Sequence, residues 1–163
     1  MLAVCGELDR TPGGPHPFPA ENTWGFTQHA PFTAVYEHDR RSVYLMVQRL
    51  KRHPFLGLFD GADPNSSTGA RTTTTVPTQA LFFLNDPFVH AKADRLAGRL
   101  LALPDDAARL DRVYRLCYGR APSAAERRVA ARFLTVDPKQ TPRQRWSAWV
   151  RVLLASNEFL YVD

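Results

Sequence analysis

Amphipathic helix patterns fill the second half of this sequence and constrain its fold more than any other feature. Apolar residues recur at three- and four-residue spacing over residues 88–103, over residues 106–118, and after Ser123 and Thr141. This spacing places the apolar side chains of a helix on one face. The connections between these segments are short, which suits helices that pack antiparallel to one another. We therefore predict a mainly α fold with a C-terminal antiparallel helical bundle over residues 78–156.

Specific chemical signals mark where the predicted helices begin and end. An N-cap side chain accepts a backbone N–H at a helix start, proline suits the first helical position, and glycine suits the left-handed position after the last turn. In a capping box, the N-cap residue and the third helical residue each accept the other's backbone N–H. The signals are Asp86 before Pro87, Pro104, Gly119, and the capping boxes Ser123–Glu126 and Thr141–Gln144.

Each helix pattern also predicts which side chains are buried. A short apolar helix over Thr78–Leu84 precedes the four longer ones, and the aromatic tail at residues 157–161 is expected to pack back on the bundle. The residues on the apolar stripes are Val89, Ala93, Leu96, Ala97, Leu100 and Leu103; Leu110, Val113, Tyr114 and Cys117; Val129, Ala130, Phe133 and Leu134; and Trp146, Trp149, Val150 and Leu153.

The first half of the chain, residues 1–77, is predicted to be mostly loop with short elements. Residues 9–39 are rich in proline. Proline fixes φ and removes an amide donor, so these residues are not expected to form a helix or a central strand. Residues 42–47 are β-branched and aromatic and predict one short strand. Residues 49–60 predict one helical turn, and residues 60–77 a second irregular segment. Aromatic side chains in the first loop predict that it packs flat on a core; they are Phe18, Trp24, Phe26, Phe32 and Tyr36.

The first residues predict the last turns of a helix. Met1–Leu8 lacks a basic region and has too short an apolar stretch for a signal peptide. Leu2 and Cys5 fall near one face of the predicted helix. Because the sequence starts inside a predicted helix, we expect the chain to be a C-terminal piece of a longer protein.

Length and composition limit the class of protein. A chain of 163 residues with 44% apolar side chains is predicted to form a single globular domain over residues 1–163. No apolar run approaches the roughly 18–20 residues that a membrane span needs. Cys5 and Cys117 cannot build a disulfide framework or a four-cysteine zinc site. No two histidines have the four-residue spacing of a helical metal site.

Positive charge is concentrated in the second part of the chain. Residues 92–163 hold 14 basic and eight acidic side chains, whereas residues 1–91 hold seven and eight. A basic surface attracts polyanions. A solvated helical surface with interspersed acidic residues explains the same composition and is favoured, and no run of Lys and Arg exceeds two residues, so nucleic acid is not favoured. The arginines of a polyanion-binding face would be Arg95, Arg99, Arg127, Arg128, Arg132 and Arg143.

One group of oxygen-bearing side chains is a weak candidate for a metal site. Asp60, Asp63 and Asn65 could offer oxygens to Ca²⁺, a hard cation that takes six to eight of them. Their spacing does not match an EF-hand loop. Turn and cap roles explain the same residues, and we favour these roles over calcium binding.

Three further residues are candidates for ligand binding. Arg71, before four threonines, could bind a carboxylate or sulfate, or instead pair with nearby carboxylates and carbonyls. Trp24 and His29 could stack on sugar rings or anchor their loop. No Gly-x-Ser-x-Gly turn, paired catalytic carboxylates or glycine-rich phosphate loop is recognisable, so the sequence identifies no catalytic residue.

Eight short strings, spread in order over nearly the whole chain, resemble one family. They are GGPHPFP at 13–19, WGFTQH at 24–29, RRSVYL at 40–45, LFDGADP at 58–64, TTTVPTQAL at 73–81, LNDPF at 84–88, YGRAP at 118–122 and SNEFLY at 156–161. Together they resemble the C-terminal part of the planctomycete domain of unknown function 1553.

The resemblance implies a large exported protein, located in the periplasm or on the cell surface. In that family the domain usually follows a second domain of unknown function, 1549, and often a cytochrome c type domain further upstream. This chain has no Cys-x-x-Cys-His motif, so the resemblance places any haem in upstream sequence and implies no cofactor in this chain.

Three functions follow as hypotheses, and whether the chain is part of an enzyme stays open. The first is a helical accessory or interaction domain that packs on its upstream neighbour, which predicts an exposed apolar surface near the N-terminus. The second is a component of an exported enzyme acting on polysaccharide, with a site in the loops at 13–38 and 60–75. The third is a polyanion-binding module, which predicts the arginines on one continuous face.

Overall fold

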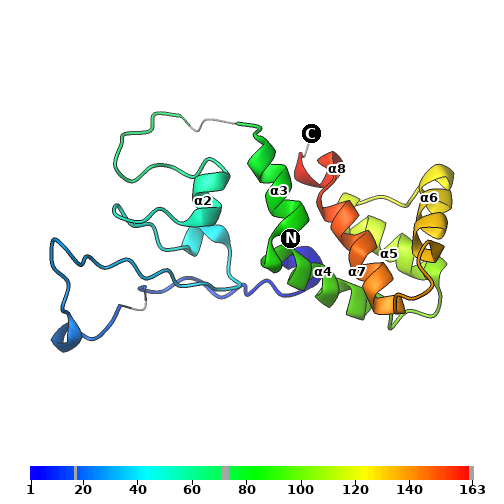
Figure 1. The fold of residues 1–163 in the computed structure, drawn as a ribbon, viewed down its shortest axis with the longest axis horizontal. Coiled ribbons are helices and arrows are strands. Elements are labelled where there is room, and N and C mark those ends of the chain that lie inside the picture. Colours follow the sequence, from blue (N-terminus) through cyan, green and yellow to red (C-terminus); the bar gives the residue numbers. More distant parts are fainter. Residues whose placement is uncertain (17, 71–73, 162–163) are drawn as a thin grey trace. The chain divides into compact units, whose positions relative to one another are not determined.

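The computed structural model describes residues 1–16, 18–70 and 74–161, and these residues form helices and loops without a β-strand (Figure 1). The predicted mainly α fold is therefore confirmed. The α-helices are α1 (Leu2–Cys5), α2 (Pro54–Leu58), α3 (Pro77–Asn85), α4 (Pro87–Leu100), α5 (Asp106–Tyr118), α6 (Ala124–Thr135), α7 (Pro142–Leu154) and α8 (Asn157–Leu160). Two 3-10 helices, η1 (Glu21–Thr23) and η2 (Ser42–Tyr44), lie between α1 and α2.

The chain divides into two compact units. The helical unit comprises Met1–Glu7 and Ala80–Asp163, and the loop unit comprises Leu8–Gln79. That the two units fold as one domain stays a prediction. No helix of the described residues is long and apolar enough to cross a membrane.

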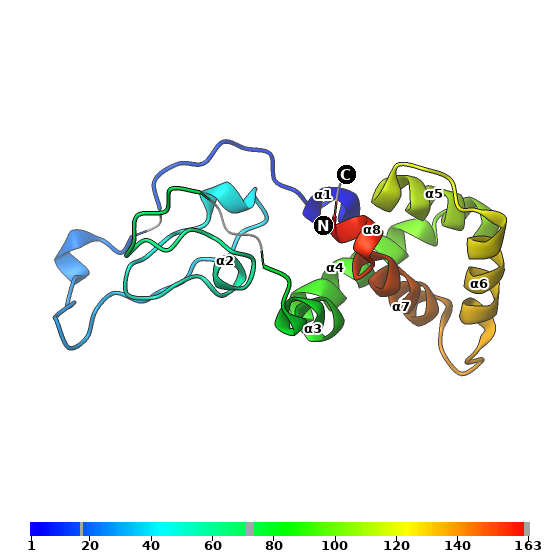
Figure 2. The same cartoon turned by 90° about the horizontal axis from the view of Figure 1, so that it is seen from above.

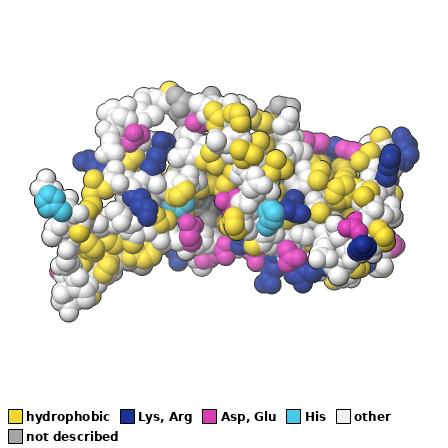
Figure 3. Space-filling view, viewed as in Figure 1, with side chains coloured by type: hydrophobic (Ala, Val, Ile, Leu, Met, Phe, Trp, Pro, Cys, Tyr) yellow, Lys and Arg dark blue, Asp and Glu magenta, His cyan; other side chains and the backbone are white. Residues whose placement is uncertain are grey.

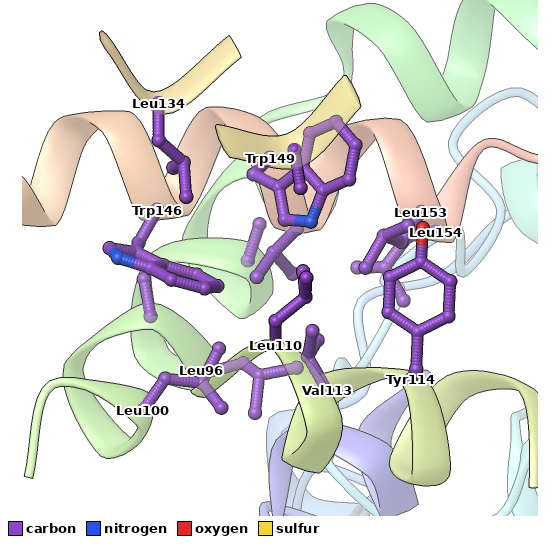
Figure 4. Close-up of a cluster of buried hydrophobic side chains, with 14 of the residues drawn as sticks. Leu96, Leu100, Leu110, Val113, Tyr114, Leu134, Trp146, Trp149, Leu153 and Leu154 are labelled. Carbon is purple, nitrogen blue, oxygen red and sulfur yellow. The ribbon is translucent and has the colours of Figure 1, made fainter. Parts of the chain in front are cut away.

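Packing of α4 against α7 forms the centre of the helical unit, and the two helices lie side by side in both ribbon views (Figures 1 and 2). They run antiparallel, because Asp94 of α4 pairs with Arg143 early in α7, whereas His90, nearer the start of α4, contacts Arg151 late in α7. The buried side chains between them and their neighbours point toward one another (Figure 4). They include Ala93, Leu96, Ala97 and Leu100 from α4, Leu110, Val113 and Tyr114 from α5, and Trp146, Trp149, Val150, Leu153 and Leu154 from α7.

The predicted helix ends are confirmed where the sequence carries a capping signal. The side chain of Asp86 accepts from the Phe88 N–H at 2.8 Å, with Pro87 as the first residue of α4. Gly119 ends α5 in the left-handed conformation, with φ of 72°. Both capping boxes form at the starts of α6 and α7, so each helix satisfies two of its orphan amides with its own side chains.

One predicted helix end and one predicted core residue are wrong. α4 ends at Leu100 rather than at Leu103, because a tight turn from the Leu103 N–H to the Leu100 carbonyl replaces the helix, and Pro104 disfavours helical backbone in the residue before it. Val129 is 59% exposed. The inward stripe of α6 follows Ala130 and Leu134, and Val129 lies one residue, about 100° of helical rotation, away from it.

The short elements at the two ends of the helical unit are predicted correctly. α1 covers Leu2–Cys5, and the Cys5 side chain is fully buried in the core. At the other end, α8 places Phe159 against that core. The two ends of the sequence therefore contribute side chains to one hydrophobic cluster.

The predicted strand at residues 42–47 is wrong. Ser42–Tyr44 forms η2, in which the amides of Tyr44 and Leu45 reach the carbonyls three residues earlier. A lone strand leaves its amides and carbonyls without a ladder, and the described residues of the loop unit offer only one isolated bridge, between Asp9 and Arg40. The helical turn expected within residues 49–60 is confirmed as α2.

Aromatic side chains of the first loop pack on one another rather than flat on a core, which corrects that prediction. The Phe32 ring lies 5.1 Å from the rings of both Phe18 and Phe26, and Trp24 lies 6.5 Å from Phe26. Phe18, Trp24 and Phe26 are nevertheless exposed. Among the described residues of the loop unit, only Met46 and His53 are buried, so this unit has little core for the aromatic residues to cover.

Truncating the centre of the α4–α7 packing should destabilise the protein strongly. Leu96 is fully buried, and Leu96→Ala removes apolar contacts and leaves a cavity, so we expect the free energy of unfolding to fall by about 2–5 kcal/mol. Val129→Ala, at the exposed position on α6, should change it by less than about 0.5 kcal/mol. Urea unfolding followed by circular dichroism measures both, and equal losses would contradict the inward face assigned to α6.

Candidate functional site

A cluster of charged side chains joins two of the strings that carry the family resemblance. Arg120, in the turn after α5, binds the carboxylate of Glu126 through Nη1 and Nη2 at 2.9 and 2.7 Å. It binds the carboxylate of Glu158 in α8 through Nε and Nη2 at 2.6 and 2.7 Å. We call these three residues the Arg120 clamp. Both carboxylates are held by two hydrogen bonds, the geometry that suits a planar guanidinium.

The Arg120 clamp has no donor left for a ligand. The guanidinium carries five N–H groups. Four bind the two carboxylates, and Nη1 also donates to the Ala121 carbonyl at 3.2 Å. Beside the clamp, the Tyr118 hydroxyl lies 2.8 Å from Ser156 Oγ and donates to the Leu153 carbonyl at 3.2 Å. The polar residues of the YGRAP and SNEFLY strings therefore bind mainly one another.

Electrostatics fix the protonation states of the clamp. Hydrogen bonds from Arg120 lower the pKa of Glu126 from 4.5 to about 2, and they lower the pKa of Glu158 in the same way. Burial raises the pKa of the neighbouring Tyr114 hydroxyl to about 12. Glu126 and Glu158 are thus ionised at neutral pH and cannot act there as general acids. The Arg120 clamp therefore has a structural role, because its hydrogen bonds connect α6 and α8 to the turn after α5.

Sequence reasoning did not identify the clamp. Arg120 and Glu158 are 38 residues apart, and no local rule of spacing links them. Both lie in strings that carry the resemblance described above, which pointed to these segments but not to their contact. Only the capping-box role of Glu126 was visible locally.

The predicted calcium ligands lie in one irregular segment of the loop unit, where hydrogen bonds engage them. The carboxylate of Asp60 accepts from the backbone N–H and the hydroxyl of Thr74, both at 2.8 Å. Asp63 accepts from the Asn65 N–H at 2.9 Å, and the Asn65 amide donates to the Arg49 carbonyl at 2.9 Å. Within the described chain, no group of three or more His, Cys, Asp or Glu side chains could hold a metal ion. Calcium binding at these residues stays a prediction.

The structure describes two of the three predicted ligand-binding residues, Trp24 and His29. Trp24 is exposed, and its Nε1 donates to the Pro19 carbonyl at 2.8 Å, which fixes the indole to its own loop. His29 is exposed within a turn closed by hydrogen bonds between Thr27 and Ala30. Arg71 lies outside the described residues. Sugar stacking by Trp24 and His29 stays a prediction.

An exposed apolar surface lies where α3 leads into α4. Leu81 and Leu84 of α3 are 52% and 56% exposed, and Phe88 at the start of α4 is 39% exposed. We call these three residues the α3–α4 surface. In the space-filling view, hydrophobic side chains gather over α3 (Figure 3). Such grouping on the outside of a protein is typical of an interaction site.

Local chemistry fixes the helix junction beneath this surface. The His90 ring binds the Leu84 carbonyl through Nε2 at 2.8 Å and so satisfies one of the last carbonyls of α3. Lys92 Nζ lies 5.2 Å from the Phe88 ring centroid and 2.9 Å from a carboxylate oxygen of Glu7. Glu7 follows α1, so the N-terminal residues of the chain lie beside the α3–α4 surface. An apolar surface near the N-terminus is what the interaction hypothesis predicts.

Several arginines of the predicted polyanion-binding face have acidic partners. Arg95 lies 3.1 Å from Glu7, and Arg143 binds both carboxylate oxygens of Asp94, at 2.8 and 2.6 Å. On the face in Figure 3, acidic side chains lie among the basic ones of the helical unit. These pairings reduce the charge that the helices offer to a polyanion.

Cys5 lies in the core of the helical unit, and Cys117 is partly buried against that core. Burial raises the pKa of Cys5 to about 11 and that of Cys117 to about 12. A thiol with a raised pKa is a poor nucleophile and a poor metal ligand at neutral pH, because both roles need the thiolate.

Comparison with known proteins identifies a family. The family model described as a protein of unknown function (DUF1553), PSD1, matches residues 1–134. No curated protein and no solved structure matches the chain.

The pKa shifts in the Arg120 clamp predict how stability depends on pH. A carboxylate whose pKa is lowered in the folded state stabilises the protein above its unfolded value of 4.5, and this stabilisation is lost as pH falls toward 2. Arg120→Gln should therefore lower stability at pH 7 and flatten the decline between pH 4.5 and 2. Urea unfolding at a series of pH values measures this. Arg132→Gln is the control, and a variant curve parallel to that of the wild type would contradict the role of the clamp.

The burial of both thiols predicts slow chemical modification. At pH 8, we expect the folded protein to resist an aromatic disulfide reagent such as DTNB, and the unfolded protein to react at two thiols per chain. The absorbance of the released thiolate measures this. Rapid reaction of either cysteine in the folded protein would contradict its raised pKa.

Proposed function

Because the chain belongs to the DUF1553 family, we propose that it is a non-catalytic helical interaction domain of a larger exported protein. Its partner in this proposal is the upstream domain of the same protein. The observation that carries the proposal is the α3–α4 surface, an exposed apolar area on a helical unit that otherwise has a well-packed core.

The position of the N-terminal residues supports an upstream partner. α1 packs on α4, and Glu7 after it pairs with Lys92, which lies over the Phe88 ring. A segment preceding Met1 would thus join the same helical unit that carries Phe88. Docking of that segment on Leu81, Leu84 and Phe88 would remove their apolar area from water, and burial of such area is favourable by roughly 25 cal/mol per Å².

The Arg120 clamp supports a role without catalysis. Polar residues at 118–122 and 156–161 hold helices together, and the carboxylates of Glu126 and Glu158 are ionised at neutral pH. The buried thiols have raised pKa values. The helical unit therefore offers strong docking features and no poised acid, base or nucleophile among these groups.

Binding between separated parts of the larger protein tests this function. We expect the 163-residue chain to bind a separately expressed polypeptide from the upstream part of the same reading frame with micromolar affinity or better. Leu84→Asp should weaken this binding at least tenfold, because it places a charge in the apolar interface. Isothermal titration calorimetry measures both affinities.

The matched control is Val136→Asp, which adds the same charge at another exposed apolar position of the helical unit. We expect it to leave the affinity unchanged, and circular dichroism checks that both variants are folded. Absence of binding, equal weakening by the two variants, or a reading frame that opens at Met1 would overturn the proposal.

A further inference from the structure

A pocket of about 430 Å³ opens between α5, α6 and α7, away from the α3–α4 surface. Pockets that bind small molecules typically measure about 300–1,000 Å³. Its apolar part is formed by Leu110, Leu134 and Trp146, all of them buried. Figure 4 shows Leu134 and Trp146 toward one side of the hydrophobic cluster, with Leu134 facing Trp146. The apolar part is thus continuous with a rigid, packed core.

The polar part of the pocket carries an excess of positive charge. Arg109, Arg127 and Arg145 line it, together with a single acidic residue, Asp106. Asp106 is already engaged, because its Oδ1 accepts from Arg109 Nη1 at 2.6 Å and from Trp146 Nε1 at 3.2 Å. One carboxylate cannot neutralise three guanidinium groups. The pocket therefore favours an anion.

The three arginines retain donors for such an anion. Arg109 Nε is buried and has no hydrogen-bond partner among the described residues. Arg145 donates from Nη1 to the Leu134 carbonyl at 2.9 Å, which fixes the side chain at the end of α6. Arg127 is half-exposed, and its nearest acidic oxygen, on Asp111, lies 3.8 Å away. Guanidinium groups fixed by one bond can still bind a carboxylate through their other N–H groups.

The backbone adds to the positive potential. α5 begins at Asp106 and α7 at Pro142, and both residues line the pocket. The N-terminal end of a helix carries a partial positive charge. α6 ends beside the pocket with the opposite polarity, but Arg145 already pairs with its Leu134 carbonyl. Two helix starts thus line the same small volume as Arg127 and Arg145.

We propose that the α5–α6–α7 pocket binds a small organic carboxylate with an aromatic or compact apolar body. The apolar body would contact Trp146 and Leu134, and the carboxylate would bind Arg127 and Arg145 at the rim. This site goes beyond the proposed interaction function, since it shares no residue with the α3–α4 surface. A polyanion fits it less well, because the arginines line one small pocket rather than a continuous helix face.

Titration with a defined probe tests this site. We expect 1-naphthoate to bind the intact chain and to shift amide resonances of residues lining the pocket in two-dimensional NMR spectra. Neutral 1-naphthamide, which keeps the aromatic body, should bind at least tenfold more weakly. Arg127→Gln should weaken naphthoate about tenfold, the typical effect of losing one charge-assisted hydrogen bond.

Two further variants separate the pocket from general attraction to the basic surface. Ala131 is exposed and lines the pocket, so Ala131→Phe should fill the space and abolish binding while the protein stays folded. Arg132→Gln removes an exposed charge from the same helix outside the pocket and should leave the affinity unchanged. No binding at 10 mM naphthoate, equal affinity for the amide, or equal effects of Arg127→Gln and Arg132→Gln would overturn the proposal.

Discussion

Antiparallel packing of α4 against α7 is the interaction on which the helical unit depends. Small side chains on α4, Ala93 and Ala97, allow the helices to approach closely, and Trp146 and Trp149 of α7 fill the space around them. Fully burying one large apolar side chain contributes roughly 1.5–3 kcal/mol. α1 packs on α4, α6 and α8 pack on α7, and α5 contacts both. Loss of this packing would therefore remove the helix pair against which α1, α5, α6 and α8 pack.

Charged residues then hold the periphery in one arrangement. The Arg120 clamp ties α8 to the α5–α6 turn, and the Asp94–Arg143 pair joins the two central helices. Exposed ion pairs contribute little to stability one at a time. In the Arg120 clamp, however, one guanidinium holds each of two carboxylates by two hydrogen bonds. This geometry fixes where α8 packs. The described residues of the loop unit are joined by turns, loop hydrogen bonds, contacts among aromatic rings and single ion pairs such as Arg40–Asp9.

Local rules predicted the helical unit well, because its signals are contained within single helices. A capping box such as that of Ser123 involves residues three positions apart, and the structure contains it as expected. The strand predicted at residues 42–47 failed because a strand needs a partner that propensity cannot supply. The contact of Arg120 with Glu158 could not be predicted either, since it depends on how α7 returns the chain to α5. The calcium and sugar-binding residues had only a composition-based argument.

The α3–α4 surface and the α5–α6–α7 pocket differ in charge, and this difference determines which kind of partner each can bind. At the α3–α4 surface, the one nearby ammonium group, on Lys92, is paired with Glu7, so the surface is apolar and close to neutral and suits another folded protein surface. In the α5–α6–α7 pocket, the lining holds three arginines and one carboxylate, Asp106, which binds Arg109, so the lining has a net positive charge that favours an anion. The same basic sequence thus produces one surface suited to protein docking and one suited to a small anion.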